Sequence, residues 1–98
     1  MISLTQSAAL ALAPHQIRVN AIAPGPVDSL MWATVRALRG ARLGQSSEAI
    51  EQAMADCVPL GRSAAPTEQV GAALYPACDE SSYVTGQTLN VDGGLFMN

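Results

Sequence analysis

Apolar residues follow two different periods along the chain, and the change of period predicts the first elements of its fold. In residues 2–13 they recur at helical spacing, and Pro14 ends that pattern. Residues 17–23 carry few polar side chains on either face, which is typical of a parallel strand covered on both sides. A Pro-Gly-Pro turn at residues 24–26 stops this strand, because proline lacks a backbone N–H and glycine tolerates positive φ.

Three further helices are predicted after this turn. Residues 27–43 are interpreted as a loop running into a helix that Gly40 and Gly44 break. The next helix ends at Pro59, and a third begins with Pro66 at its first position. Polar residues suited to cap the first two of these helices stand in pairs: Asp28 or Ser29, and Ser46 or Ser47.

A second strand is expected at residues 88–91, and it completes a strand, helix, strand order. This order predicts a βαβ unit, in which the two strands are parallel and the crossover is right-handed. The strand at residues 17–23 should therefore pair in parallel with it and bury Val19, Ala21 and Ile22. The fold class is α/β, with the order helix, strand, helical insertion, helix, strand.

Pro76 lies within the last predicted helix. A proline in a helix interior removes a hydrogen bond and clashes with the preceding turn, at a cost of roughly 3 kcal/mol. We therefore expect the helix to bend or end within a turn of Pro76. Its expected packing face consists of Val70, Ala73, Leu74 and Ala77.

Composition excludes several classes of function. The 98 residues suffice for one small domain, and a net charge of −3 with no lysine argues against a nucleic-acid surface. Cys57 and Cys78 are far apart and His15 is the single histidine, so no zinc-binding set is predicted. The sequence has no membrane-spanning apolar run and no signal-like start, and a cytoplasmic location with free thiols is expected.

Three blocks of this sequence resemble the C-terminal part of the short-chain dehydrogenase/reductase family: LTQSAALALAPHQIRVNAIAPGPVDS, PLGR and SSYVTGQTLNVDGG. The resemblance implies the C-terminal portion of a Rossmann-type, doubly wound parallel sheet, here a partial domain over residues 1–98. The region of Trp32 is also similar to the polyol (sorbitol-type) dehydrogenase branch. Acyl-carrier-protein reductases are the alternative branch, and they often carry Thr-Asp-Met where this chain has Ser29, Leu30 and Met31.

The resemblance implies a nicotinamide-binding edge at the end of the first strand and a variable substrate-binding lobe over residues 28–57. In family members the Pro-Gly pair packs against the nicotinamide ring, and the backbone at the position of Val27 binds the carboxamide. Considered without the resemblance, the Pro-Gly pair is a common turn signal and a Met/Trp pair is common core packing. The candidate residues for NAD or NADP are Pro24, Gly25, Val27 and Ser29, and those for substrate are Met31 and Trp32.

The family's proton-transfer and pyrophosphate-binding motifs have no counterpart in these residues. No Tyr-x-x-x-Lys occurs and no Gly-rich turn follows a strand, so no catalytic residue and no metal ligand is assigned. By the resemblance, the chain would start just after the catalytic pair. One interpretation is the C-terminal portion of a homodimeric or homotetrameric NAD(P)-dependent oxidoreductase acting on an alcohol or ketone, with a polyol as a candidate substrate. The alternative is a non-catalytic remnant that contacts full-length relatives through its first helix.

Overall fold

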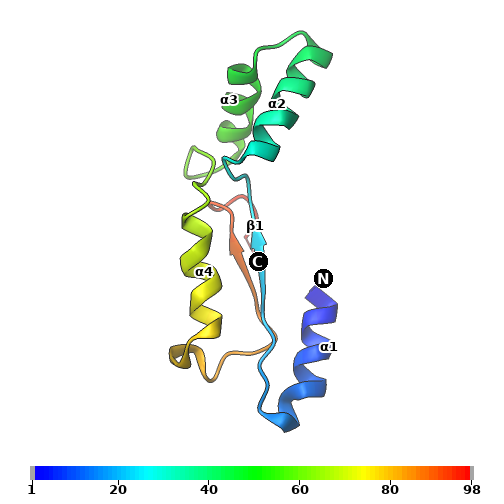
Figure 1. Cartoon of the computed structure of the whole chain (residues 1–98), viewed down its shortest axis with the longest axis vertical. Helices are drawn as coiled ribbons and strands as arrows, with labels where there is room; N and C mark the ends of the chain where they lie inside the picture. The colour runs from blue at the N-terminus through cyan, green and yellow to red at the C-terminus, as the bar shows by residue number, and fades with distance from the viewer. Residues whose placement is uncertain (1, 98) are drawn as a thin grey trace.

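Two short parallel strands form the middle of the molecule, with a helical hairpin beyond one end of them (Figure 1). The structure is a computed structural model that describes residues 2–97. The molecule is elongated and measures 55 × 23 × 23 Å. In chain order the elements are α1 (Ile2–Leu12), the 3₁₀ turn η1 (Ala13–His15), β1 (Ala21–Pro24), α2 (Leu30–Leu43), α3 (Ser47–Cys57), α4 (Glu68–Ala77), the 3₁₀ turn η2 (Asp79–Ser81) and β2 (Thr88–Val91).

Strands β1 and β2 pair in parallel, which confirms the predicted α/β arrangement. Ile22 lies opposite Leu89 in the register. β2 has the predicted bounds, whereas β1 begins only at Ala21. Before that point the partners of the chain include side chains: the Val19 N–H donates to the Thr85 hydroxyl at 3.0 Å. These side-chain contacts replace the regular ladder over residues 17–20.

Burial of the first strand was predicted too strongly. Val19, Ala21 and Ile22 are only half-buried, because each strand of a two-stranded sheet has a neighbour along a single edge. In the described part of the chain the buried apolar side chains lie outside both strands: Ala9, Ile50, Ala55 and Val58.

Both outer helices expose apolar side chains, and in α4 these belong to the face that was expected to pack. In α1, Leu4 is 69% exposed, while Thr5 and Ala9 are buried. In α4, Val70 and Leu74 are 51% and 58% exposed. Helical periodicity identifies an apolar stripe, but the neighbours in space decide which residues are covered. Between residues 2 and 97, no helix combines the length and apolar character needed to cross a membrane.

The ends of the helices follow the local chemical signals closely. Helix α4 ends at Ala77, directly after Pro76, which confirms the expected effect of this proline. The Ser29 hydroxyl caps α2 by accepting from the Trp32 N–H at 3.2 Å. Ser46 caps α3 in the same way through the Ala49 N–H at 3.1 Å. Each predicted cap pair is thereby resolved to one residue.

Gly44 ends α2 in a left-handed conformation with φ 68°, but Gly40 does not break the helix as predicted. Gly40 lies inside α2, and the carbonyl of Gln45 folds back against it. A Cβ on Gly40 would lie 2.5 Å from the Gln45 oxygen, closer than any side chain could remain. The glycine thus permits the tight turn from α2 to α3.

We expect Gly40→Ala and Gly71→Ala to change stability in opposite directions. Both sites are helical, and alanine gains about 0.8–1 kcal/mol over glycine in a helix. Gly71 has open space around its Cβ position, so this gain should be realised there. At Gly40 the Gln45 carbonyl must move, and overpacking of about 1–3 kcal/mol should outweigh the gain. Urea unfolding checks both, and equal stabilisation by the two variants would contradict the packing argument.

Candidate functional site

The segment that follows β1 and the first turns of α2 enclose a surface pocket of about 290 Å³. Five of the six residues predicted to bind cofactor or substrate line it. The sixth, Pro24, is exposed and lines a neighbouring hollow of about 540 Å³. The residues around the smaller pocket are Gly25, Pro26, Val27, Ser29, Met31, Trp32 and Val35.

The backbone of Val27 has two unused polar groups. Val27 forms a parallel bridge with Ala64, in which the Ala64 N–H donates to the Pro26 oxygen at 2.9 Å and the Asp28 N–H donates to the Ala64 oxygen at 2.8 Å. Such a bridge uses the residues on either side of Val27, so its own N–H and C=O face away from Ala64. Within the described residues neither group has a hydrogen-bond partner. A donor and an acceptor next to each other match the two polar groups of a carboxamide.

Ser29 combines a structural role with its place in the pocket. Its oxygen accepts from the Trp32 N–H and so fixes the start of α2 beside the pocket. The hydroxyl proton is not used by this cap, because a hydroxyl can accept and donate at the same time. Ser29 can therefore hold the helix and still donate to a bound molecule.

Gly25 is required by packing alone. A Cβ at this position would lie 2.6 Å from the Cβ and 2.7 Å from the Cα of Asp92, so the chain after β1 passes directly against the chain after β2. The Asp92 carboxylate is itself held in place, because it accepts from the N–H groups of Gly94 and Phe96 at 3.0 Å each. The Pro-Gly signal predicted a turn, but only the structure shows this close approach.

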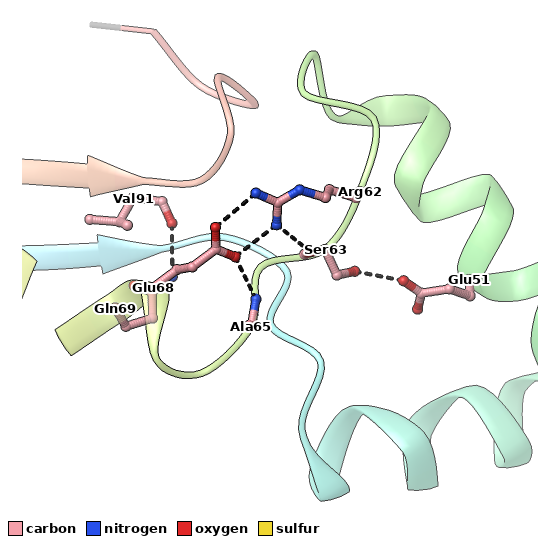
Figure 2. A network of polar contacts seen from close by, with 7 residues as sticks. All are labelled: Glu51, Arg62, Ser63, Ala65, Glu68, Gln69 and Val91. Atoms are coloured by element: carbon pink, nitrogen blue, oxygen red, sulfur yellow. Dashed lines mark hydrogen bonds and ion pairs between the residues drawn. The ribbon is translucent and has the colours of Figure 1, made fainter. Parts of the chain in front are cut away.

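Trp32 is half-buried and its indole N–H donates to the carboxylate of Glu51 on α3. The same carboxylate forms an ion pair with Arg36 at 3.3 Å. Its other oxygen accepts from the Ser63 hydroxyl at 2.7 Å, and Figure 2 shows this second contact. These contacts, the indole hydrogen bond foremost, lower the pKa of Glu51. Sequence reasoning missed Glu51, because its partners lie 12 to 19 residues away and no local pattern connects them.

The connection from α3 to α4 is ordered by a second charged cluster (Figure 2). The Arg62 guanidinium donates to both carboxylate oxygens of Glu68 at 2.7 Å, and the Ala65 N–H donates to Glu68 at 2.7 Å. The bond from Arg62 is the largest cause that lowers the pKa of Glu68, to about 2. Helix α4 consequently begins at Glu68, two residues later than the sequence predicted, with Pro66 in the turn before it. This cluster holds the segment that contains Ala64, the bridge partner of Val27.

Other reactive side chains do not extend the site. Tyr83 is fully exposed and Tyr75 is 46% exposed, both outside the pocket. Residues 2–97 contain no group of three or more His, Cys, Asp or Glu side chains that could hold a metal ion.

The unused N–H and C=O of Val27 make the pocket suited to binding a molecule that carries an amide. The apolar walls beside these groups are formed by Met31, Trp32 and Val35.

Comparison with known proteins gives consistent matches over nearly the whole chain. A family model described as enoyl-(acyl carrier protein) reductase matches residues 1–96. Galactitol 2-dehydrogenase from Agrobacterium fabrum is 47% identical over 98 residues, which are 100% of this chain and 38% of that protein.

Solved structures show the same arrangement of elements. Sorbitol-6-phosphate 2-dehydrogenase from Erwinia amylovora superposes with a TM-score of 0.90 at 35% identity, over 99% of this chain and 38% of that one. A variant of actinorhodin polyketide ketoreductase, solved with NADPH, superposes with a TM-score of 0.86 at 35% identity, over 96% of this chain and 36% of that one. The chain thus spans between a third and two fifths of the length of these relatives.

Proposed function

Because the chain belongs to the short-chain dehydrogenase/reductase family, we propose that its 98 residues form the C-terminal part of an NAD(P)-dependent oxidoreductase, the part that faces nicotinamide and substrate. The reaction class is hydride transfer between the nicotinamide ring and an alcohol or ketone. A polyol is the first substrate class to test, since one relative is named for galactitol and another for sorbitol 6-phosphate. The ketoreductase solved with NADPH supports a nicotinamide cofactor without selecting NAD or NADP for this chain.

The observation that carries this proposal is the pair of unused backbone groups on Val27, a residue of the pocket. The Val27 N–H would donate to the carboxamide oxygen of nicotinamide, and the Val27 C=O would accept from its NH₂ group. The Ser29 hydroxyl supplies a further donor. When bound, the nicotinamide ring supplies or accepts the hydride.

The apolar part of the pocket would serve the other reactant. The apolar wall of the pocket consists of three side chains on consecutive turns of α2: Met31, Trp32 and Val35. Apolar side chains around the reacting carbon would exclude water, which strengthens polar interactions in the site. The proposal leaves proton transfer and pyrophosphate binding to a Tyr/Lys pair and a Gly-rich turn, which these 98 residues do not contain.

A hybrid enzyme tests the proposal. In it, these 98 residues replace the matching stretch of the Agrobacterium fabrum galactitol 2-dehydrogenase. We expect the hybrid to bind its dinucleotide and to oxidise galactitol, because 47% identity over 100% of the chain preserves the fold. A folded hybrid that binds no dinucleotide would contradict the proposal.

Within this hybrid, we expect Val27→Pro to raise the KM for the dinucleotide roughly two- to tenfold, since one hydrogen bond is worth about 0.5–1.5 kcal/mol. Proline removes the N–H of residue 27 but neither hydrogen bond of the bridge to Ala64, because these bonds use Pro26 and Asp28. Val27→Ala is the matched control, because it keeps the N–H and should leave this KM near the parent value. An equal rise in both variants would assign the effect to packing.

A second candidate function is non-catalytic binding to a full-length relative through α1. It is favoured by the exposure of apolar side chains on this helix, with Leu4 69% and Leu10 78% exposed. The hybrid enzyme distinguishes the two candidates. A folded but inactive hybrid, with a free chain that forms a stable complex with a full-length relative, would favour the second.

A further inference from the structure

Trp32 stands out in the pocket because the N–H of its indole ring is hydrogen-bonded to another side chain. Met31, the other large side chain at the start of α2, is 75% exposed. The Trp32 indole is half-buried and bonded through its N–H to Glu51. Glu51 belongs to α3 and is not among the residues that line the pocket. The anchor therefore acts on the wall of the pocket from behind.

Three parts of the chain meet at the Glu51 carboxylate. One oxygen contacts the Trp32 indole and Arg36, both on α2, and the other oxygen accepts from Ser63, between α3 and α4. The side chains of Arg36 and Glu51 are 23% and 27% exposed. A carboxylate that accepts from several donors while half-buried makes stronger and more directional bonds than a solvated one. Such bonds restrict the indole to one orientation.

We propose that Glu51 is a positioning residue, which holds the Trp32 indole as a fixed wall of the pocket and thereby sets the width available to the substrate. The part of this inference that concerns substrate rests on the proposed function. Without Glu51 the indole would sample several rotamers, and a flexible wall would bind a substrate less tightly and select less well by shape. The anchor itself depends only on the fold of these 98 residues.

A purely structural role for Glu51 makes a different prediction. In that case its task would be to join α2 and α3, which its ion pair with Arg36 also does. Arg36→Gln removes this ion pair without touching the indole contact, so it serves as the matched control. Glu51→Ala removes both contacts, whereas Glu51→Gln keeps an acceptor oxygen for the indole.

Trp32 is the single tryptophan of the chain, so its fluorescence reports on this position alone. We expect Glu51→Ala to raise acrylamide quenching of Trp32 about twofold, because loss of a charge-assisted hydrogen bond frees the ring. Glu51→Gln and Arg36→Gln should stay near the parent chain, with the helical circular dichroism signal retained. Unchanged quenching in Glu51→Ala, or an equal rise in Arg36→Gln, would overturn the proposal.

Time-resolved anisotropy of the unmodified chain tests whether the indole is immobile even where a variant fails to fold. An anchored Trp32 should lose its anisotropy at the rate at which the whole molecule tumbles, and a dominant subnanosecond decay would overturn the anchor. In the hybrid enzyme, Glu51→Ala should raise the KM for galactitol several-fold more than the KM for the dinucleotide. An inactive hybrid would count against the proposed function, while the fluorescence results would still decide the role of Glu51.

Discussion

Purified as 98 residues, the chain should turn over no polyol or ketose with NAD(P) and should bind neither dinucleotide at micromolar concentration. Positioned acid/base catalysis is commonly worth 10²–10⁴-fold in rate, and the chain has no lysine to pair with a tyrosine for this task. Binding of the dinucleotide by the isolated chain should also be weak. The two backbone groups of Val27 contribute about 0.5–1.5 kcal/mol each, against roughly 8 kcal/mol for a micromolar ligand.

Calorimetric titration with NADH and NADPH, together with an activity screen over polyols and ketoses, measures this result. The active hybrid enzyme is the positive control, because it presents the same residues with a complete dinucleotide site. Two results would contradict this expectation: micromolar binding by the 98 residues, or turnover that persists after contaminating enzymes are removed. Either would show that the 98 residues form a binding site larger than the two backbone groups of Val27.

Gly25→Ala should destabilise the chain by about 1–3 kcal/mol, the usual cost of overpacking. The added methyl group would lie 2.6 Å from the Asp92 Cβ and 2.7 Å from its Cα, and a backbone atom cannot rotate away. The strain also falls on the last bond of the ladder, which the Gly25 N–H donates to Val91 at 3.0 Å. The ends of β1 and β2 would have to separate.

Urea unfolding without any dinucleotide is the relevant measurement for Gly25→Ala. Gly71→Ala is the control, because a Cβ there meets no atom within 4 Å. A loss of stability in the absence of ligand would show that this glycine is needed for packing before any cofactor binds. If Gly25→Ala is as stable as the parent, the close approach to Asp92 is not maintained in solution.

Local signals were sufficient for most element boundaries. The bounds of β2, the end of α4 after Pro76 and the left-handed Gly44 each depend on residues adjacent in sequence. A serine cap acts within one turn, so Ser29 and Ser46 were among the residues predicted to begin α2 and α3. Five of the six candidate cofactor- and substrate-binding residues lie around one pocket, because they belong to a single short stretch of the chain.

Predictions about how deeply a side chain is buried were less successful, because burial depends on residues that are distant in the sequence. The apolar stripe of α4 and the side chains of β1 were expected to be covered, but helical and strand periods do not say what lies opposite. Gly40 was interpreted as a helix breaker because its contact with Gln45 depends on how the chain turns after α2.

The sequence by itself determined the order of the elements, the parallel pairing of the strands and the short segment that carries the candidate cofactor-binding residues. Caps, prolines and glycines act through bonds between near neighbours, which a linear sequence displays. Only the tertiary structure showed the hydrogen bond from Trp32 to Glu51 and the close approach of Gly25 to Asp92. It also showed that the bridge to Ala64 does not use the backbone N–H and C=O of Val27. Each of these depends on the distance between residues far apart in the chain, which packing alone sets.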